Sequence, residues 1–159
     1  MNIGIIVHSQ TGHTLLVGER IQEKLRADGH EVTLIRMQNI NGTDGAADPK
    51  NIQLDRMPEV DGYDGLIFGA WVQAFNLCPG FSKYIQQLPK IETDQVGCFL
   101  TQQFRYKWMG GNLALAKMKK AIAAKDAKVR ATGVINWSNK KRDKQIEDLA
   151  ATFSRQFQI

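Results

Sequence analysis

Short apolar runs alternate with helical patterns along the whole chain, and this alternation constrains the fold more than any other feature of the sequence. The runs are short and rich in β-branched residues, which favours buried strands. We expect strands at Ile3–Val7, Val32–Ile35, Leu66–Phe68, Val96–Leu100 and Val129–Trp137. Most of the segments between and after them carry apolar residues at helical spacing. The alternation predicts an α/β fold with a parallel sheet covered by helices on both faces.

Length and composition indicate one globular unit. With 159 residues, 43% hydrophobic and 23% charged, we expect residues 1–159 to form a single domain. No apolar run approaches the ~18 residues of a membrane span. The first residues lack a basic leader segment, so we expect a cytoplasmic protein. Two cysteines, Cys78 and Cys98, are too few for a disulfide scaffold, and no residue spacing predicts a metal site.

The charge is distributed unevenly along the chain. The net charge is +5, but residues 1–79 hold 6 Lys and Arg against 10 Asp and Glu, whereas residues 80–159 hold 15 against 6. A basic half fits an acidic protein, a nucleic acid or an anionic small molecule, and a solvated lysine-rich surface is the alternative. Known nucleic-acid motifs are absent, which disfavours a nucleic-acid partner.

Three segments follow expected strands and should meet at one edge of the sheet. They are Ser9–Thr14, Gly69–Pro79 and Thr101–Gly111. In open α/β sheets, ligands bind beyond the carboxyl ends of the strands, so the chemistry is expected in these segments.

The first segment has the composition of a phosphate-binding loop. Its residues are Ser9, Gln10, Thr11, Gly12, His13 and Thr14. Unpaired N–H groups at a helix N-terminus attract anions, and hydroxyl groups add hydrogen bonds. Helix capping by one hydroxyl is the alternative, but three hydroxyls favour an anion site. The segment matches neither the Walker loop nor the GxGxxG dinucleotide pattern.

The residues of this segment and of two others resemble a known family. Ile3–Thr14 is similar to the first strand and the Ser/Thr-x-Thr-Gly-x-Thr phosphate loop of the flavodoxin-like FMN-binding family. Asp61–Gly69 is similar to the family's third strand, and Gly110-Gly111 to its third loop. The resemblance implies a three-layer α/β/α sandwich with a five-stranded parallel sheet in the order 2-1-3-4-5. It also implies noncovalently bound FMN, with its phosphate on residues 9–14.

The resemblance places the flavin ring between the second and third loops. The residues expected to contact the cofactor there are Ala70, Trp71, Val72, Gln73, Ala74, Phe75, Thr101, Gln102, Gln103, Phe104, Gly110 and Gly111. Either Trp71 or Phe104 would stack on the ring. A cation near the pyrimidine edge, from Arg105 or Lys107, would favour the two-electron reduced anionic flavin. The family's usual acidic surroundings are absent here.

The sequence leaves several functions open. The first is a redox protein that carries electrons through FMN to an acidic partner protein. The second is an enzyme that passes electrons from a nicotinamide cofactor, NADH or NADPH, to a quinone. A non-redox module that binds another phosphate ligand or nucleic acid is the third. The long connection 38–59 would either cap the site or mediate a homodimer.

Overall fold

The computed structural model describes residues 1–40, 51–106 and 108–158. The strands are β1 (Asn2–His8), β2 (Glu31–Met37), β3 (Gly65–Gln73), β4 (Asn76–Leu77), β5 (Val96–Gln102) and β6 (Val129–Asn136). The helices are α1 (His13–Ala27), α2 (Pro79–Gln87), α3 (Gly111–Ala123) and α4 (Arg142–Gln156). The expected order of strands and helices is therefore confirmed.

The sheet has the predicted topology with one short addition. Within the described residues its long strands are all parallel and lie in the order β2-β1-β3-β5-β6. Apart from β4, this is the expected order 2-1-3-4-5. The short β4 pairs antiparallel with the end of β3, Val72 with Leu77 and Gln73 with Asn76. The second loop therefore contains a tight hairpin that the sequence did not predict.

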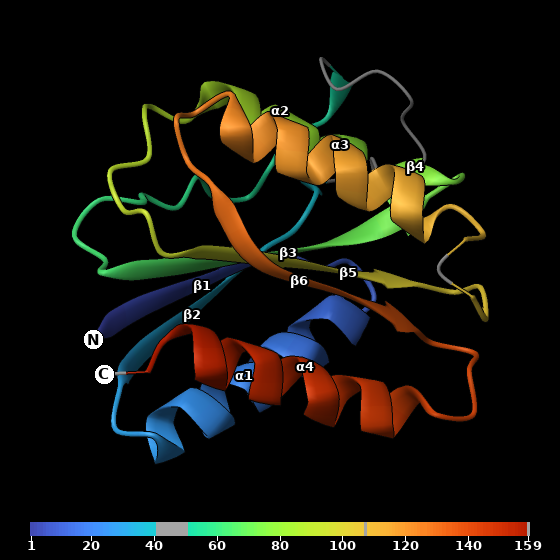
Figure 1. The fold of residues 1–159 in the computed structure, drawn as a ribbon. Helices are drawn as coiled ribbons and strands as arrows, with labels where there is room; N and C mark the ends of the chain where they lie inside the picture. Colours follow the sequence, from blue (N-terminus) through green and yellow to red (C-terminus); the bar gives the residue numbers. More distant parts are fainter. Residues whose placement is uncertain (41–50, 107, 159) are drawn as a thin grey trace.

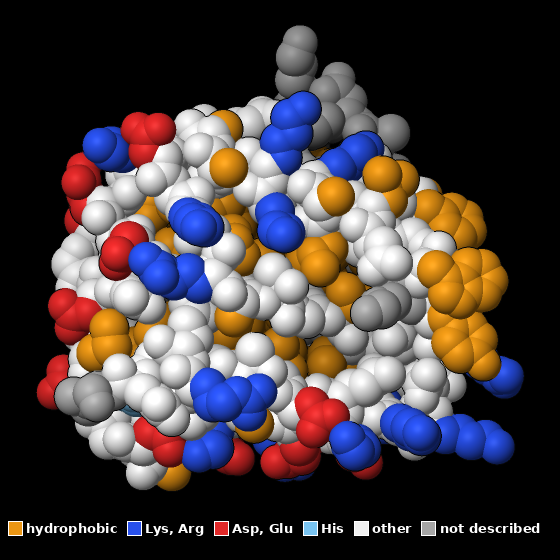
Figure 2. All heavy atoms as spheres, in the orientation of Figure 1, with side chains coloured by type: hydrophobic (Ala, Val, Ile, Leu, Met, Phe, Trp, Pro, Cys, Tyr) orange, Lys and Arg blue, Asp and Glu red, His pale blue; other side chains and the backbone are white. Residues whose placement is uncertain are grey.

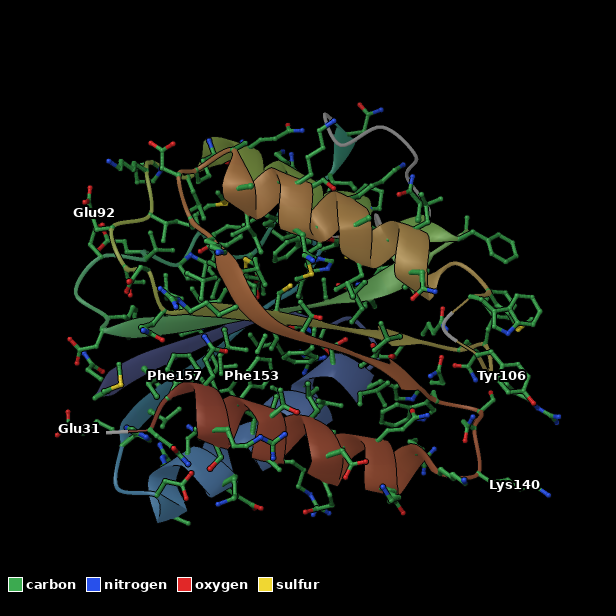
Figure 3. All side chains as sticks on the ribbon, viewed as in Figure 1. Glu31, Glu92, Tyr106, Lys140, Phe153 and Phe157 are labelled. Atoms are coloured by element: carbon green, nitrogen blue, oxygen red, sulfur yellow. The ribbon has the colours of Figure 1, made fainter. Side chains whose placement is uncertain are left out.

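Helices cover both faces of the sheet and form a three-layer sandwich. Helices α2 and α3 lie on one face, and α1 and α4 lie on the other (Figure 1). Each face buries its own apolar cluster; Phe81 and Met118 belong to one, and Ile21 and Phe153 to the other. Phe153 and Phe157 point from the end of α4 toward the sheet (Figure 3). No helix in the described part of the chain is both long and apolar enough to cross a membrane.

The close packing of α4 on the sheet depends on glycines in the strands. A Cβ on Gly97 in β5 would lie 2.3 Å from the ring of Phe153, and a Cβ on Gly65 in β3 would lie 2.4 Å from the ring of Phe157. Because real Cβ atoms never approach so closely, these glycines let the two rings lie directly on the backbone of the strands. Helix α4 and the residue that follows it can therefore pack directly on β3 and β5.

The connection between β2 and β3 is described in part, because residues 41–50 lie outside the described residues. Asn39 forms an isolated antiparallel bridge with Leu54, and Ile52 is buried. The Tyr84 hydroxyl donates to the carbonyl oxygen of Pro58 at 2.6 Å. The described end of the connection is thus packed against α2 and the end of β2. Its expected role as a cap or a dimer contact stays a prediction.

Candidate functional site

A cavity of about 480 Å³ lies where the carboxyl ends of β1, β3 and β5 meet. Its lining residues come from all three segments in which the sequence predicted chemistry. They are Gln10, Thr11, His13, Thr14, Trp71, Val72, Gln73, Thr101, Gln102 and Gln103. The volume falls within the ~300–1,000 Å³ typical of cofactor and small-molecule sites.

The first segment forms a tight turn that leads into α1. Gly12 precedes the helix with φ 100°, a left-handed conformation that glycine adopts without strain. Ser9 Oγ accepts a hydrogen bond from the backbone N–H of Leu15 at 3.2 Å, and Thr14 Oγ1 is 2.8 Å from Thr101 Oγ1. The Ser9 and Thr14 side chains are buried. Two of the three hydroxyls therefore hold the turn in shape, and Thr11 stays exposed at the cavity.

The backbone N–H groups of this turn are available to a ligand. Between Gln10 and Thr14, none of them donates to an acceptor among the described residues. They lie at the positive end of the α1 dipole, where negative charge is stabilised. The guanidinium of Arg36 in β2 donates to the carbonyl oxygens of Ser9 and Gln10 at 3.0 and 3.2 Å. Arg36 was not predicted as a site residue. The available signal was a charged side chain next to the apolar residues of a strand.

The second segment contributes a wall of the cavity through the end of β3. Trp71, Val72 and Gln73 line the cavity, whereas Ala70 is buried within the strand. Ala74 and Phe75 form the two-residue turn between β3 and β4 with φ 49° and 65°. Two consecutive positive φ angles match the common type I′ hairpin turn, here built without its usual asparagine or glycine. Neither turn residue lines the cavity.

The third segment lines the cavity with Thr101, Gln102 and Gln103, and Phe104 lies outside it. The Phe104 ring stacks on Phe75 instead, with ring centroids 4.9 Å apart and planes inclined by 9°. Of the two aromatic residues proposed for stacking on a ligand, the structure brings Trp71 to the cavity and pairs Phe104 with the hairpin.

The two glycines before α3 bring the second and third loops together. Gly110 has φ 107°, and a Cβ there would lie 2.9 Å from the Cα of Phe75. A Cβ on Gly111 would lie 3.1 Å from the amide atoms of Gln102. Neither glycine lines the cavity. Their observed role is to allow the start of α3 to approach the β3–β4 turn and the Gln102 amide.

Two residues that line the cavity each have a buried side-chain oxygen without a hydrogen-bond partner among the described residues. The two oxygens are Oε1 of Gln73 and Oε1 of Gln102. The Gln102 amide is held in one orientation, because its Nε2 donates to the Tyr106 carbonyl oxygen at 2.7 Å and to Asn136 Oδ1 at 2.5 Å. A buried acceptor without a donor costs about 1–3 kcal/mol. A ligand whose N–H groups reached these oxygens would remove that cost.

His13 lines the cavity as part of an aromatic stack. Its imidazole lies on the indole of Trp137, with centroids 3.8 Å apart and planes inclined by 10°. The Arg142 guanidinium lies over the same indole, 4.6 Å from its centroid. Partial burial and the charge of Arg142 lower the pKa of His13 below its ordinary value of 6.5. Trp137 follows the last strand, and the sequence offered no signal that it would reach His13.

Four exposed aromatic rings form a cluster beside the cavity: Phe75, Phe104, Tyr106 and Trp108. Trp108 is 71% exposed and stacks on Tyr106. Figure 2 shows hydrophobic side chains gathered at this edge of the molecule. Arg105 is exposed within the cluster and does not line the cavity. Lys107, the other cation expected near a ligand, lies outside the described residues.

The two cysteines are buried and unreactive in character. Burial raises the pKa of the Cys78 and Cys98 thiols to about 12. Cys78 precedes α2, but desolvation outweighs any lowering of its pKa by the helix N-terminus. Within the described residues, no group of His, Cys, Asp and Glu side chains is arranged to hold a metal ion.

Comparisons with known proteins find similarity in structure and none in sequence. No protein-family model matches the chain, and no curated protein does. Oxidised flavodoxin 2 from Bacillus cereus is 16% identical with a TM-score of 0.67, covering 99% of this chain and 100% of that chain. Two-electron reduced flavodoxin from Megasphaera elsdenii is 17% identical with a TM-score of 0.62, covering 96% and 98%.

A flavoprotein in complex with FMN from Lactobacillus acidophilus NCFM is also similar. It is 16% identical with a TM-score of 0.61, and the match covers 91% of this chain and 97% of that chain. The similarity spans nearly the full length of all three proteins and includes the sheet and both helical layers. The chain therefore has the flavodoxin-like fold.

Proposed function

We propose that the chain binds FMN noncovalently in the cavity at the carboxyl ends of β1, β3 and β5 and acts as a redox protein. One observation carries the proposal. The cavity has unpaired backbone N–H groups at the start of α1, and its lining residues Gln73 and Gln102 carry buried side-chain oxygens that lack a donor among the described residues. A phosphate needs donors and a flavin ring N–H needs an acceptor, so the residues present fit FMN. Structural neighbours that are flavodoxins or hold FMN support the same proposal.

Each part of FMN has chemically suitable residues. The backbone N–H groups of residues 11–14 and the Thr11 hydroxyl would hold the phosphate. Trp71 offers a flat aromatic surface for the ring, and the oxygens of Gln73 and Gln102 would accept from its N–H. When bound, FMN supplies one-electron and two-electron transfer. The chain itself binds, orients and partly shields the cofactor from water.

The buried hydroxyls prepare the phosphate loop before any ligand binds. Ser9 caps the backbone N–H of Leu15, and Thr14 is tied to Thr101 on β5. Because these bonds are already made, the loop loses little conformational entropy when it takes up a phosphate. The shape of the loop thus favours binding of a monoester phosphate over binding of the ring alone.

For the physiological partner, we favour an acidic redox protein. Tyr106 and Lys140 lie at the carboxyl-end edge of the sheet, whereas Glu31 and Glu92 lie at the opposite edge (Figure 3). The backbone of Arg105 lies close to Asn139, which precedes Lys140 in the chain, since the Arg105 carbonyl oxygen accepts from Asn139 Nδ2 at 2.9 Å. Cations next to exposed aromatic rings at the mouth of the site suit a partner with acidic residues around its own redox centre. A cytoplasmic location stays a prediction of the sequence.

The visible absorption spectrum of the purified protein, before and after adding FMN, tests the cofactor. We expect saturable binding with a shift of the flavin bands and quenching of flavin fluorescence. Riboflavin, which lacks the phosphate, should bind more weakly. A colourless protein whose addition leaves the FMN spectrum unchanged would contradict the proposal. If that protein also retained DNA with a steep salt dependence, the non-redox alternative would be favoured.

A kinetic assay separates the carrier from the enzyme. As a carrier, the FMN-loaded protein should oxidise NADH or NADPH very slowly with a quinone as acceptor. Rapid steady-state turnover would favour the oxidoreductase instead. Reduction by a donor reductase, followed by reoxidation by an acidic acceptor protein, is the activity expected of a carrier, and high salt should slow it.

A further inference from the structure

A chain of three hydrogen bonds runs behind the cavity and joins two of its lining residues. Trp71 Nε1 donates to His8 Nδ1 at 2.9 Å. The other ring nitrogen of His8, Nε2, lies 2.7 Å from Asn39 Oδ1. The backbone N–H of Asn39 then donates to Gln10 Oε1 at 2.7 Å. His8 and Asn39 are buried and do not line the cavity, whereas Trp71 and Gln10 do.

The direction of these bonds fixes the protonation of His8. An indole N–H can only donate, so His8 Nδ1 must present its lone pair to Trp71. Nε2 then carries the ring proton and donates it to Asn39 Oδ1. The imidazole is therefore neutral in this arrangement, as the Nε2–H tautomer. If Nδ1 carried a proton, its N–H would face the indole N–H of Trp71, and the hydrogen bond between them would be lost.

The geometry makes His8 a determinant of the plane of the Trp71 indole. The two rings are inclined by only 11°, with centroids 6.1 Å apart. Since the two bonded nitrogens are 2.9 Å apart, the rings meet edge to edge in nearly one plane. The imidazole is itself fixed at both nitrogens, so the indole cannot rotate about χ2 without losing its hydrogen bond.

The His8 ring is closely packed by residues of the neighbouring elements. A Cβ on Gly80, at the start of α2, would lie 2.6 Å from His8 Nε2 and 2.7 Å from Asn39 Oδ1. The Cys78 thiol lies 3.4 Å from His8 Nδ1. β1, β3, α2 and the segment after β2 therefore converge on one imidazole. Such convergence is the kind of support that holds a binding side chain in a single orientation.

We propose that His8 is a positioning residue: as a neutral imidazole it sets the plane of the Trp71 indole in the cavity wall, and through Asn39 it ties that wall to Gln10 in the phosphate loop. The effect on a ligand rests on the proposed function, because FMN is the flat aromatic ligand considered. The effect on Trp71 itself does not depend on any ligand.

The first test uses the ligand-free protein and NMR spectroscopy. The indole N–H signal of Trp71 is assigned by its loss in Trp71→Phe. We compare His8→Phe, which keeps a ring without an acceptor, with His8→Asn, whose side-chain oxygen lies near the place of Nδ1. Slow exchange of the Trp71 indole proton with water is expected in the wild type and in H8N. Fast exchange and a shifted signal are expected in H8F.

His30→Phe is the matched control. His30 is also buried, but it precedes β2 at the other end of the sheet and its Nδ1 lies 3.2 Å from the N-terminal nitrogen of Met1. A general loss of stability would affect H8F and H30F alike, whereas the Trp71 signal should change only in H8F. An unchanged Trp71 signal in H8F would overturn the proposal. If H8F does not fold, ¹⁵N shifts of the His8 ring in the wild type decide, and a protonated Nδ1 overturns it.

The second test measures FMN binding by fluorescence quenching in the same variants. H8F should bind FMN about tenfold more weakly than the wild type, as expected when a flat binding surface loses its one orientation, and H8N should recover most of the affinity. Equal affinities in the wild type and H8F would overturn the effect on the ligand. If the wild type binds no FMN, the proposed function fails, and the NMR measurement alone decides the role of His8.

Discussion

Replacing Gly110 by alanine should disturb the contact between the second and third loops of the cavity. Gly110 has φ 107°, and an added Cβ would lie 2.9 Å from the Cα of Phe75, a backbone atom that cannot swing away. The left-handed conformation costs a non-glycine residue about 1–2 kcal/mol. Forcing a methyl group against packed backbone adds about 1–3 kcal/mol. G110A should therefore lose about 2–5 kcal/mol of unfolding free energy.

Gly29 provides the matched control. It has φ 97°, and a Cβ at Gly29 would meet no atom within 4 Å. G29A therefore carries the conformational strain without the contact and should lose about 1–2 kcal/mol. Urea unfolding followed by circular dichroism measures both variants. If they lost the same free energy, the close approach of Gly110 to Phe75 would be refuted. FMN affinity should fall in G110A and stay at the wild-type value in G29A.

Three further predictions follow from backbone strain and burial. Ala74→Gly should raise the unfolding free energy by about 0.5–1 kcal/mol, because glycine relieves the strain of φ 49°; an unchanged or lower Tm would contradict this. The Cys78 and Cys98 thiols, whose pKa values burial raises to about 12, should resist a thiol reagent at mildly alkaline pH until the protein unfolds; rapid labelling of the native protein would argue against their burial. The lowered pKa of His13 means that the unfolded chain binds more protons between that value and 6.5. The stability of the wild type relative to His13→Asn should therefore fall as the pH drops through this range, and parallel pH profiles of unfolding would count against it.

The fold was predictable because the local pattern of apolar residues indicates each long strand and each helix. Val96–Leu100 is a continuous apolar run, and burial on both faces of a parallel sheet requires such a run. The short β4 was not predictable, since two residues are too few to show the alternation of side chains that indicates a strand. The turn before β4 was not predictable either, because its residues give no turn signal. Ala74 and Phe75 adopt positive φ without the glycine or asparagine that would signal a type I′ turn.

The candidate site was predictable as three segments, but its contacts were not. The loop Ser9–Thr14 follows a strand and precedes a helix, so its place at the cavity follows from the order of elements. Which aromatic residue faces the cavity depends on packing between distant segments. Phe104 was a candidate for stacking on a ligand. Its ring stacks instead on Phe75 of the left-handed turn, and Phe104 does not line the cavity. The stack of His13 on Trp137 likewise joins residues that are far apart in the sequence, so it could not be predicted from local patterns.

A crystal structure of the protein with FMN tests the central claim most directly. The phosphate should lie within hydrogen-bond distance of the backbone N–H groups of residues 11–14. The ring should lie against Trp71, with the oxygens of Gln73 and Gln102 accepting from its polar edge. FMN found at another surface, or a phosphate bound away from the start of α1 while this loop stays free, would contradict the account.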